Sequence, residues 1–240
     1  MIANDNAEFN NSEQPKPKKP RKPRKPSEGP LRDKTRTMAR MVAAVGKVIQ
    51  KKGYPGLTAP NIALAAGVNK QLVWTYFGGV DNLVEEYINQ RDFWKSGAKP
   101  LIQQIFSNAE NAGVNETNSV LQAQLEIIMK DKVWQKIIHW ELGENKKMLK
   151  VLAEKREETG EMLLNLIDPY FENTDVNIRA RLALLIGGIY YLSLHSKSNG
   201  STVCGIDINE NEGRLAIEKG IRDIIVESFE KAELQKKNTF

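Results

Sequence analysis

The stretch TAPNIALAAGVNKQLVWTYFGG, residues 58–79, predicts two short helices joined by a tight turn. Thr58 is typical of the residue that precedes a helix, and Pro60 suits the first helical turn. Gly67 interrupts the apolar pattern and tolerates the positive φ that such a turn requires. Asn69 can cap a second short helix over residues 70–75. The stretch therefore predicts a helix-turn-helix.

The second helix of this motif commonly enters the major groove of DNA with its N-terminal residues first. Amide and cationic side chains can pair with base edges or phosphates there, and the ring N–H and O–H groups of aromatic residues suit phosphate oxygens at the rim. A hydroxyl at a helix N-terminus suits a phosphate as well. We expect DNA contacts from Thr58, Asn69, Lys70, Gln71, Trp74, Thr75 and Tyr76. For Trp74, simple packing is the alternative.

The charge is unevenly distributed along the chain. The formal net charge is +5, and by count it is +3 in residues 1–30, +5 in residues 31–95 and −3 in residues 96–240. A basic N-terminal part followed by a mildly acidic C-terminal part suits a polyanionic partner. The segment PKPKKPRKPRKP, residues 15–26, favours extended polyproline II. Its Arg21 and Arg24 suit a narrow DNA minor groove, although a merely solubilising tail is the alternative.

The remaining pattern predicts an all-helical fold. Apolar residues recur at three- and four-residue spacing from residue 31 onward, and no sustained strand alternation follows. We expect a disordered basic tail over residues 1–30, a helix-turn-helix domain over 31–80, and a helical regulatory and dimerisation domain over 81–240. In the last of these, Asp81 and Asp175 are expected to cap helices.

Several classes of protein are disfavoured. The single cysteine, Cys204, rules out a disulfide framework within the chain. There is no secretory signal and no apolar run of the ~18 residues that a membrane helix needs, so we expect a cytoplasmic protein without membrane contact. No enzyme signature or cofactor motif is present. His139 and His195 are the only histidines, and they form no metal-binding pattern with Cys204.

The region TAPNIALAAGVNKQLVWTYFGGVDNL resembles the DNA-binding region of TetR-family transcriptional regulators over about residues 35–83. The matching positions are Thr58, Ile62, Ala63, Ala66, Gly67, Val68, Val73, Tyr76, Phe77 and Leu83. The chain departs from the family pattern at Asn61, where Asp is usual, at Gln71 and Trp74, where a small residue and Tyr are usual, and at Val80, where a phosphate-binding Lys is usual. The resemblance implies a homodimeric DNA-binding regulator.

The stretch KVWQKIIHWELGENKKML, residues 132–149, crowds apolar and aromatic residues onto one helix. Core packing is one interpretation. The other is a ligand cavity lined by Ile137 and Trp140, with His139 or Glu141 as a polar anchor. The TetR resemblance implies a small-molecule effector among the central helices. The stretch LAEKREETGEMLLNL, residues 152–166, is interpreted as a solvated, charged helix face with Leu152, Met162, Leu163 and Leu166 behind it.

Gly187 and Gly188 lie inside an apolar helical pattern, where each glycine costs ~1 kcal/mol relative to alanine. Close approach of another helix would justify this cost. Together with the apolar face of the last helix, from Ile217 to Phe229, they predict a four-helix dimer interface, with an ordinary intrachain core as the alternative.

These observations predict a sequence-specific, ligand-responsive repressor that binds a palindromic operator as a homodimer. A non-specific architectural protein driven by the basic tail is the alternative. A helical enzyme that uses a cavity near His139 is a third, weaker hypothesis.

Overall fold

The computed structural model describes residues 30–91 and 99–238, with side chains from residue 33 onward. Helices account for nearly all of the regular structure in these ranges, and an isolated bridge joins Val203 to Ile206. The predicted all-helical class is therefore confirmed. No described helix has both the length and the apolar character needed to cross a membrane. The predicted DNA contacts of Arg21 and Arg24, and the tail that carries them, lie outside the described residues.

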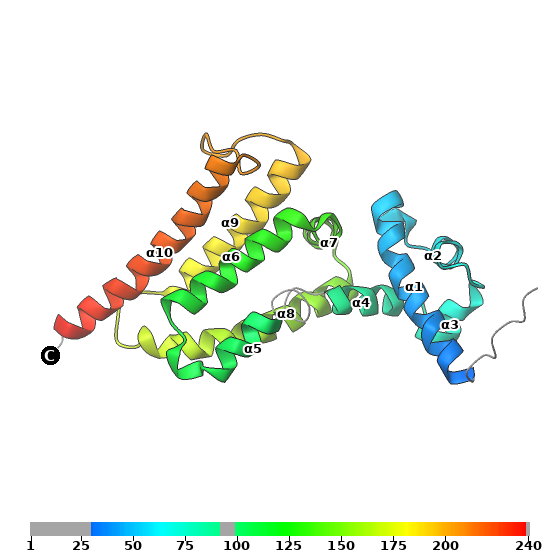
Figure 1. Cartoon of the computed structure of the whole chain (residues 1–240), viewed down its shortest axis with the longest axis horizontal. Helices are drawn as coiled ribbons and strands as arrows, with labels where there is room; N and C mark the ends of the chain where they lie inside the picture. Colours follow the sequence, from blue (N-terminus) through cyan, green and yellow to red (C-terminus); the bar gives the residue numbers. More distant parts are fainter. Residues whose placement is uncertain (1–29, 92–98, 239–240) are drawn as a thin grey trace, which may run out of the picture.

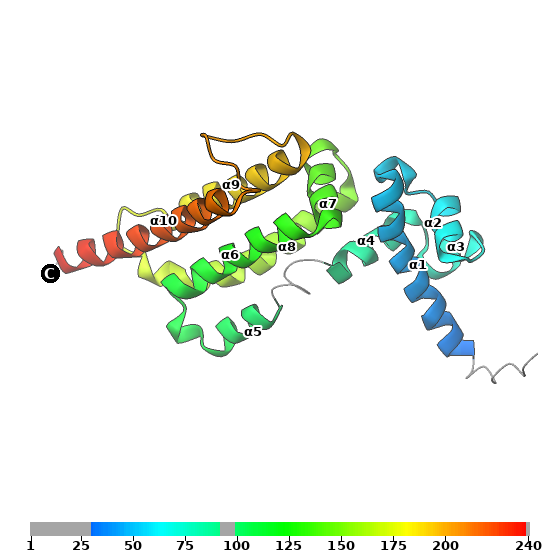
Figure 2. The same ribbon diagram turned by 45° about the horizontal axis from the view of Figure 1, so that its top comes forward.

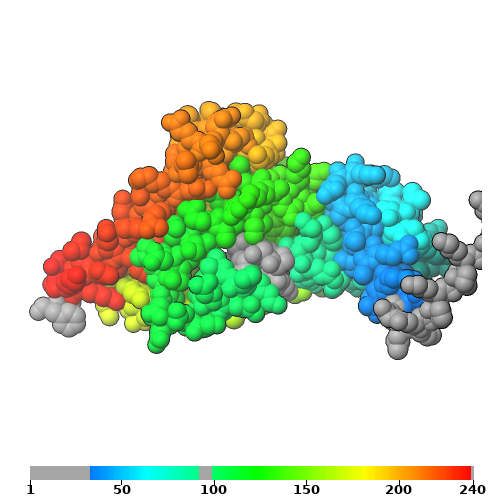
Figure 3. All heavy atoms as spheres, viewed as in Figure 1, coloured from blue at the N-terminus to red at the C-terminus, as the bar shows by residue number. Residues whose placement is uncertain are grey.

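Four helices form one end of an elongated molecule (Figures 1 and 3). They are α1 (Pro30–Lys52), α2 (Ala59–Ala66), α3 (Gln71–Phe77) and α4 (Val80–Arg91), with a short 3-10 turn at Tyr54–Gly56 between α1 and α2. We call this end of the molecule the head. It contains both helices that the sequence predicted for the helix-turn-helix.

The described residues from 99 to 238 form a second group of helices. It comprises α5 (Lys99–Ser107), a 3-10 turn (Ala109–Asn111), α6 (Val114–Lys130), α7 (Lys132–Gly143), α8 (Lys147–Ile167), a 3-10 turn (Asp168–Tyr170), α9 (Ile178–Ser198) and α10 (Asn211–Asn238). In both ribbon views α6, α9 and α10 run side by side, and in Figure 1 α8 lies below them (Figures 1 and 2). We call this part the body.

The head is held together by one apolar face of α1. Met41, Val45 and Ile49 repeat at the four-residue spacing of a helix and are fully buried. They share a hydrophobic core with Ile62 of α2 and Leu83 of α4, which are also fully buried. Each such side chain contributes ~1.5–3 kcal/mol by leaving water. The periodic pattern read from the sequence is therefore the pattern of this core.

Where α1 crosses α4, Gly46 makes room for Tyr87. A β-carbon placed on Gly46 would lie 2.3 Å from the Tyr87 hydroxyl oxygen and 3.0 Å from its ring edge. Tyr87 is only 6% exposed, and burial raises the pKa of its hydroxyl. The glycine is thus required by a close approach rather than by its backbone conformation.

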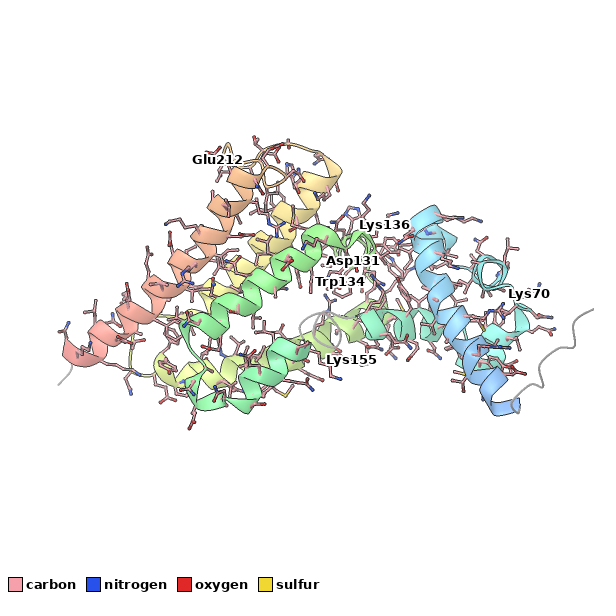
Figure 4. All side chains as sticks on the ribbon, in the orientation of Figure 1. Lys70, Asp131, Trp134, Lys136, Lys155 and Glu212 are labelled. Carbon is pink, nitrogen blue, oxygen red and sulfur yellow. The ribbon has the colours of Figure 1, made fainter. Side chains whose placement is uncertain are left out.

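Polar and aromatic contacts join the head to the body. Lys136 of α7 donates to the carbonyl oxygens of Ile49 and Gln50, at 3.2 and 3.0 Å, near the C-terminal end of α1. The ring of Tyr54 stacks on Trp140 of α7 with 4.2 Å between centroids. Figure 4 shows Lys136, Asp131 and Trp134 gathered where α7 faces the head.

Two ion pairs add to this junction from α4. Glu85 accepts from Lys155 of α8 at 2.7 Å, and Arg91 donates to Asp131, the residue that caps α7. Asp131 also accepts from the backbone N–H groups of Val133 and Trp134. The helix that leaves the head is therefore attached to both α7 and α8.

The helix caps expected at Asp81 and Asp175 are wrong. Asp81 lies inside the first turn of α4, which begins at Val80, so its carboxylate is placed to favour the helix dipole rather than to cap the helix. Asn177 caps α9 by accepting from the backbone N–H of Ala180 at 2.9 Å. Asp175 instead accepts from Lys231 and Gln235 of α10. The Asp81 prediction fails because α4 begins one residue earlier, at Val80. The Asp175 prediction fails because its carboxylate binds side chains of α10, and Asn177 caps α9 instead.

We expect the variant Gly46→Ala to destabilise the protein by about 1–3 kcal/mol, because a β-carbon overpacks the crossing of α1 and α4. The measurement is chemical denaturation followed by circular dichroism. Gly143→Ala is the matched control: a β-carbon there meets no atom within 4 Å, so its stability should be unchanged or slightly raised. Equal stability of both variants would contradict the close approach of Tyr87.

Candidate nucleic-acid interface and effector cavity

The turn between α2 and α3 has the backbone conformation that the sequence predicted. Gly67 adopts φ 64° and ψ 45°, in the left-handed region that favours glycine. The backbone N–H of Val68 donates to the carbonyl oxygen of Ala63 at 3.0 Å, which closes the end of α2. This geometry fixes the direction in which α3 leaves the turn.

A long-range clamp that the sequence analysis did not anticipate holds the same turn. Arg40 of α1 donates from Nη2 to the carbonyl oxygens of Ala66 and Gly67, at 2.5 and 3.1 Å. These are two of the carbonyl groups that the end of a helix leaves unpaired, and a cation is favoured there by the helix dipole. Arg40 therefore ties the position of α3 to the core helix α1.

At the other end of α2, Asn61 stands where Asp is usual in the family pattern that this sequence resembles. Its Nδ2 donates to the carbonyl oxygen of Gly56 at 2.9 Å, and its Oδ1 accepts from Lys52 at 2.8 Å. An ionised Asp could accept from Lys52 but could not donate to Gly56. The departure from the family pattern thus has a local structural use.

Thr58 caps α2 as expected, since its Oγ1 accepts from the backbone N–H of Asn61 at 3.4 Å. Its hydroxyl hydrogen remains available as a donor, because a hydroxyl both donates and accepts. The residue is exposed. It is therefore placed as the sequence analysis required for a phosphate contact.

The helix α3 presents a row of exposed side chains to solvent. Lys70, rather than the expected Asn69, is the N-cap residue of α3, and Asn69 accepts from the backbone N–H of Gln71, the first helical residue, at 2.9 Å. Lys70, Gln71 and Thr75 are exposed, and Trp74 is 54% exposed. On the opposite face Val73 is fully buried in the core of the head. Figure 4 shows Lys70 at the outer edge of the head, on the side away from the body.

Two members of this row have internal partners. Thr75 donates its hydroxyl to the carbonyl oxygen of Gln71 at 3.1 Å, which leaves its oxygen as an acceptor. Tyr76 is half-buried, and the ammonium group of Lys34 lies 5.4 Å from the centroid of its ring. A cation from α1 thereby stands beside the aromatic rim of α3.

The body contains a cavity of about 500 Å³ between α5, α6, α8 and α9. Its walls are mainly apolar and include Ile105, Leu121, Leu164 and Ile186. Polar side chains enter it from three helices, namely Gln124, Arg156 and Tyr190. Its volume lies within the range of ~300–1,000 Å³ that is usual for small-molecule sites.

This cavity does not coincide with the ligand site expected around α7. Ile137 is 1% exposed and belongs to the core, and Trp140 is stacked on Tyr54 of the head. His139 is exposed on the opposite side of the helix. None of the three lines the cavity among the described residues. In those ranges no group of three or more His, Cys, Asp or Glu side chains is placed to hold a metal ion.

Glu141 is connected to the cavity wall through an ion pair with Arg156. It accepts from Arg156 of α8, whose side chain is 10% exposed and lines the cavity. The interpretation of residues 152–166 as a solvated face is therefore wrong at Arg156 and Gly160, which face the cavity together with Leu163 and Leu164. A signal existed in the sequence: Gly160 and the leucine pair interrupt the charged run at helical spacing.

One face of α9 is apolar and exposed. Leu184 is 77% exposed and Tyr191 is 58% exposed, and these residues lie two helical turns apart. Between them, a β-carbon on Gly187 or Gly188 would meet no atom of the described chain within 4 Å. The close helix that these glycines predict is thus not supplied by the described part of this chain.

Comparison with known proteins agrees with the geometry of the head. Residues 42–87 match the family model described as bacterial regulatory proteins, tetR family. This range includes most of the core of α1, the whole helix-turn-helix and most of α4. A comparison with curated protein sequences found no match.

Solved structures resemble the chain along most of its length. A protein of Clostridium perfringens assigned as a fatty acid metabolism regulator has a TM-score of 0.55 at 17% identity, covering 78% of this chain and 96% of that one. The fatty acid degradation regulator FadR from Bacillus halodurans has a TM-score of 0.53 at 17% identity, covering 83% and 96%. A TetR family transcription regulator from Marinobacter aquaeolei has a TM-score of 0.53 at 13% identity, covering 81% and 97%.

Identities this low show a shared fold alone. The family model identifies the DNA-binding region, and the solved structures extend the likeness to the arrangement of the body. The resemblance that the sequence indicated is thereby confirmed.

We expect Arg40→Ala to destabilise the protein by about 1–2 kcal/mol, because two carbonyl oxygens at the end of α2 lose a charged donor. Arg36→Ala is the matched control, since Arg36 is exposed and pairs only with Asp33 of its own helix at 3.0 Å. Such a pair contributes ~0–1 kcal/mol. Thermal unfolding of both variants is the measurement, and an equal loss in the two would contradict the clamp.

Proposed function

We propose that this chain, whose helix-turn-helix region belongs to the TetR family of bacterial regulatory proteins, is a ligand-responsive repressor that binds a palindromic operator as a homodimer. The observation that carries the proposal is the exposed row of α3. Lys70, Gln71, Trp74 and Thr75 project from a helix whose other face is locked into the core by Val73. A rigid helix with an uncovered polar face is what recognition of a major groove requires.

The side chains of this row suit two kinds of contact. The amide of Gln71 can pair with the edge of an adenine, and Lys70 can pair with guanine or with a phosphate. Thr58 and Tyr76 lie at the edges of the row and suit phosphates, as does the indole N–H of Trp74. Asn69 is fixed by its hydrogen bond from Gln71 but keeps its NH₂ group as a donor.

Lys34 offers a cation for the rim of the groove. The family pattern has a phosphate-binding lysine at the position of Val80, which here is half-buried and packs against the core. Lys34 of α1 stands over the ring of Tyr76 instead. A lysine from the first helix would then supply the backbone contact that position 80 does not.

A second copy of the chain would cover the exposed apolar face of the body. Leu184 and Tyr191 on α9 form one side of this face, and Ile224 of α10 is 40% exposed. A β-carbon on Gly188 would meet no atom of the described chain within 4 Å, so a helix could approach closely there, whereas Gly187 lines the cavity. Two-fold pairing of α9 and α10 with their symmetry mates makes a four-helix interface. It would place two α3 helices ~34–36 Å apart, or a multiple of that distance, on one face of DNA.

The contacts between the cavity and the head suggest how an effector would act. Arg156, on the cavity wall, is paired with Glu141 of α7. The same helix caps α1 through Lys136 and stacks on Tyr54 through Trp140. A ligand that moves α8 relative to α7 would therefore shift the head. The mechanism is a population shift toward conformers whose α3 helices no longer match the operator.

A non-specific architectural protein remains the alternative, because residues 1–95 have a positive net charge whereas residues 96–240 have a negative one. Such a protein would bind through phosphates alone and would not distinguish between DNA sequences. The exposed amides and the tryptophan of α3 favour sequence recognition. An enzyme centred on His139 is not favoured, since that side chain is exposed and lies away from the cavity.

The DNA-binding role is tested with a duplex selected by the wild-type protein from random sequences. Gln71→Ala should lose about 1–3 kcal/mol of affinity for that duplex and little for a scrambled one. Lys70→Ala should lose affinity and also reduce the salt slope by about one if it contacts a phosphate. Lys150→Ala, an exposed lysine of α8, is the control and should bind normally. Unchanged affinity in both α3 variants, or equal binding of selected and scrambled duplexes, would refute sequence recognition by α3.

The dimer is tested by placing a charge on its proposed face. We expect Leu184→Glu to convert a dimer into monomers, because a carboxylate buried against an apolar face costs several kcal/mol. Leu142→Glu, at a leucine that is 70% exposed at the end of α7, should leave the dimer intact. Analytical ultracentrifugation measures both. A Leu184→Glu protein that stays dimeric would place the interface elsewhere.

A further inference from the structure

The charged groups around the cavity restrict the class of ligand that it can hold. Two arginines line it, Arg156 and Arg179, and among the described residues no lysine or histidine does. Arg156 is paired with Glu141, as described above. Arg179 binds Glu161 at 2.6 Å and Asp168 at 2.6 Å, and its hydrogen bond to Glu161 lowers the pKa of the Glu161 carboxyl. Both cations are therefore already neutralised by carboxylates of the same chain.

Two further carboxylates belong to the same wall. Glu116 and Glu157 line the cavity, and Glu116 accepts from the backbone N–H of Gly113 at 3.1 Å. Together with the partners of the two arginines, the carboxylates in and around the cavity outnumber the cations. A buried anion is costly unless a cation pairs with it. An entering carboxylate would have to displace Glu141 or Asp168 and Glu161 to obtain one.

The uncharged polar groups of the cavity, in contrast, are incompletely matched. Gln124 is 4% exposed, and its Nε2 donates to the Tyr190 hydroxyl at 2.9 Å. Two buried oxygen atoms on the cavity wall formed by α6 have no hydrogen-bond partner. They are Oε1 of Gln124 and Oγ1 of Thr117. Buried polar groups are nearly always paired in folded proteins. These two atoms therefore indicate where a ligand would complete the hydrogen bonding.

A hydroxyl group fits Gln124 in either orientation of its amide. As described, Oε1 needs a donor. If the amide were turned over, Tyr190 would donate to Oε1 and the NH₂ group would need an acceptor. A hydroxyl both donates and accepts, whereas a carboxylate only accepts. Burial raises the pKa of the Tyr190 hydroxyl, opposed by the charge of Arg156, so Tyr190 stays protonated near neutral pH.

We infer that this cavity binds an uncharged, mainly apolar molecule that carries a hydroxyl group, and that it discriminates against the carboxylate of the same chain length. The hydroxyl pairs with Gln124, and the apolar part lies along Leu121, Leu164 and Ile186. The role of this molecule as effector rests on the proposed function, whereas the choice between alcohol and acid rests on the cavity alone.

Isothermal titration of the purified full-length chain with 1-decanol and with decanoate at pH 7.5 tests the choice. Decanol should bind at least about tenfold more tightly, which corresponds to ~1.4 kcal/mol. Gly160→Phe, which projects a ring into the cavity, should weaken decanol binding and so locate it. Decanoate binding as tightly as decanol, no binding of decanol, or decanol binding that Gly160→Phe leaves unchanged would each overturn the inference.

A charge variant makes the test sharper. Glu141→Gln releases Arg156 from its carboxylate, so decanoate affinity should rise about tenfold while decanol affinity changes little. Glu154→Gln, on the exposed face of α8, is the matched control and should bind both compounds as the wild type does. If decanoate gains nothing from folded Glu141→Gln, the paired charge is not the cause of discrimination and the inference fails.

A second variant covers the case in which Glu141→Gln does not fold. Gln124→Leu keeps the size of the side chain and removes its hydrogen bond, so decanol should bind about three- to tenfold more weakly. Unchanged decanol affinity in this variant would remove Gln124 from the site and overturn the inference.

Release of the selected duplex is measured in the same samples. Decanol that binds in the cavity without releasing DNA would leave the ligand class standing and would refute the proposed effector role. Absence of sequence-specific DNA binding would refute the proposed function without bearing on which ligand the cavity takes. The two failures are therefore distinguishable.

Discussion

The C-terminal half of α1 is the structural element on which both ends of the molecule depend. Its apolar face forms the core of the head, and Arg40 on its flank holds the turn that aims α3. Its last carbonyl groups are not left to water, because Lys136 of α7 donates to two of them. One helix therefore positions α3 and at the same time receives the contact from the body.

This arrangement makes α7 the mechanical link between the cavity and the head. On one side Trp140 and Lys136 contact the 3-10 turn and the end of α1. On the other side Glu141 contacts Arg156 on the cavity wall. Packed rings and charge-assisted hydrogen bonds are both short-ranged, so both kinds of contact depend closely on the position of α7. Glu85 and Arg91 of α4 attach the head to the body as well.

The sequence could predict the features that depend on local chemistry. Gly67 was expected to adopt a positive φ, Thr58 to cap a helix and the apolar spacing of α1 to form a core, and each of these holds in the structure. The short helix expected over residues 70–75 is observed as α3, Gln71–Phe77, an agreement that local periodicity allows. The domain limits and the DNA-contacting residues stay predictions, since no nucleic acid is bound.

The features that sequence could not predict depend on which distant groups meet. Asp175 looked like a helix cap, yet two side chains of α10 occupy its carboxylate. Trp140 looked like the wall of a ligand site, yet a buried aromatic on α7 also suits a domain junction, and only the position of Tyr54 decides between them. Arg156 belongs to a charged segment of the sequence. No neighbouring residue indicated that its side chain would be buried in an ion pair with Glu141, fifteen residues earlier.

The two arginines of the cavity show why burial, rather than the number of charges, decides what such a site accepts. The side chain of Arg179 is 40% exposed and is paired with Glu161 and Asp168, so it offers an entering anion only a charge that is already neutralised and screened by water. The side chain of Arg156 is 10% exposed and its partner Glu141 is 21% exposed, so each ion depends on the other for its lost hydration. An acidic ligand could replace Glu141 only by leaving that carboxylate buried without a cation. The pair that links the cavity to α7 is therefore also the group that makes a neutral ligand the better occupant.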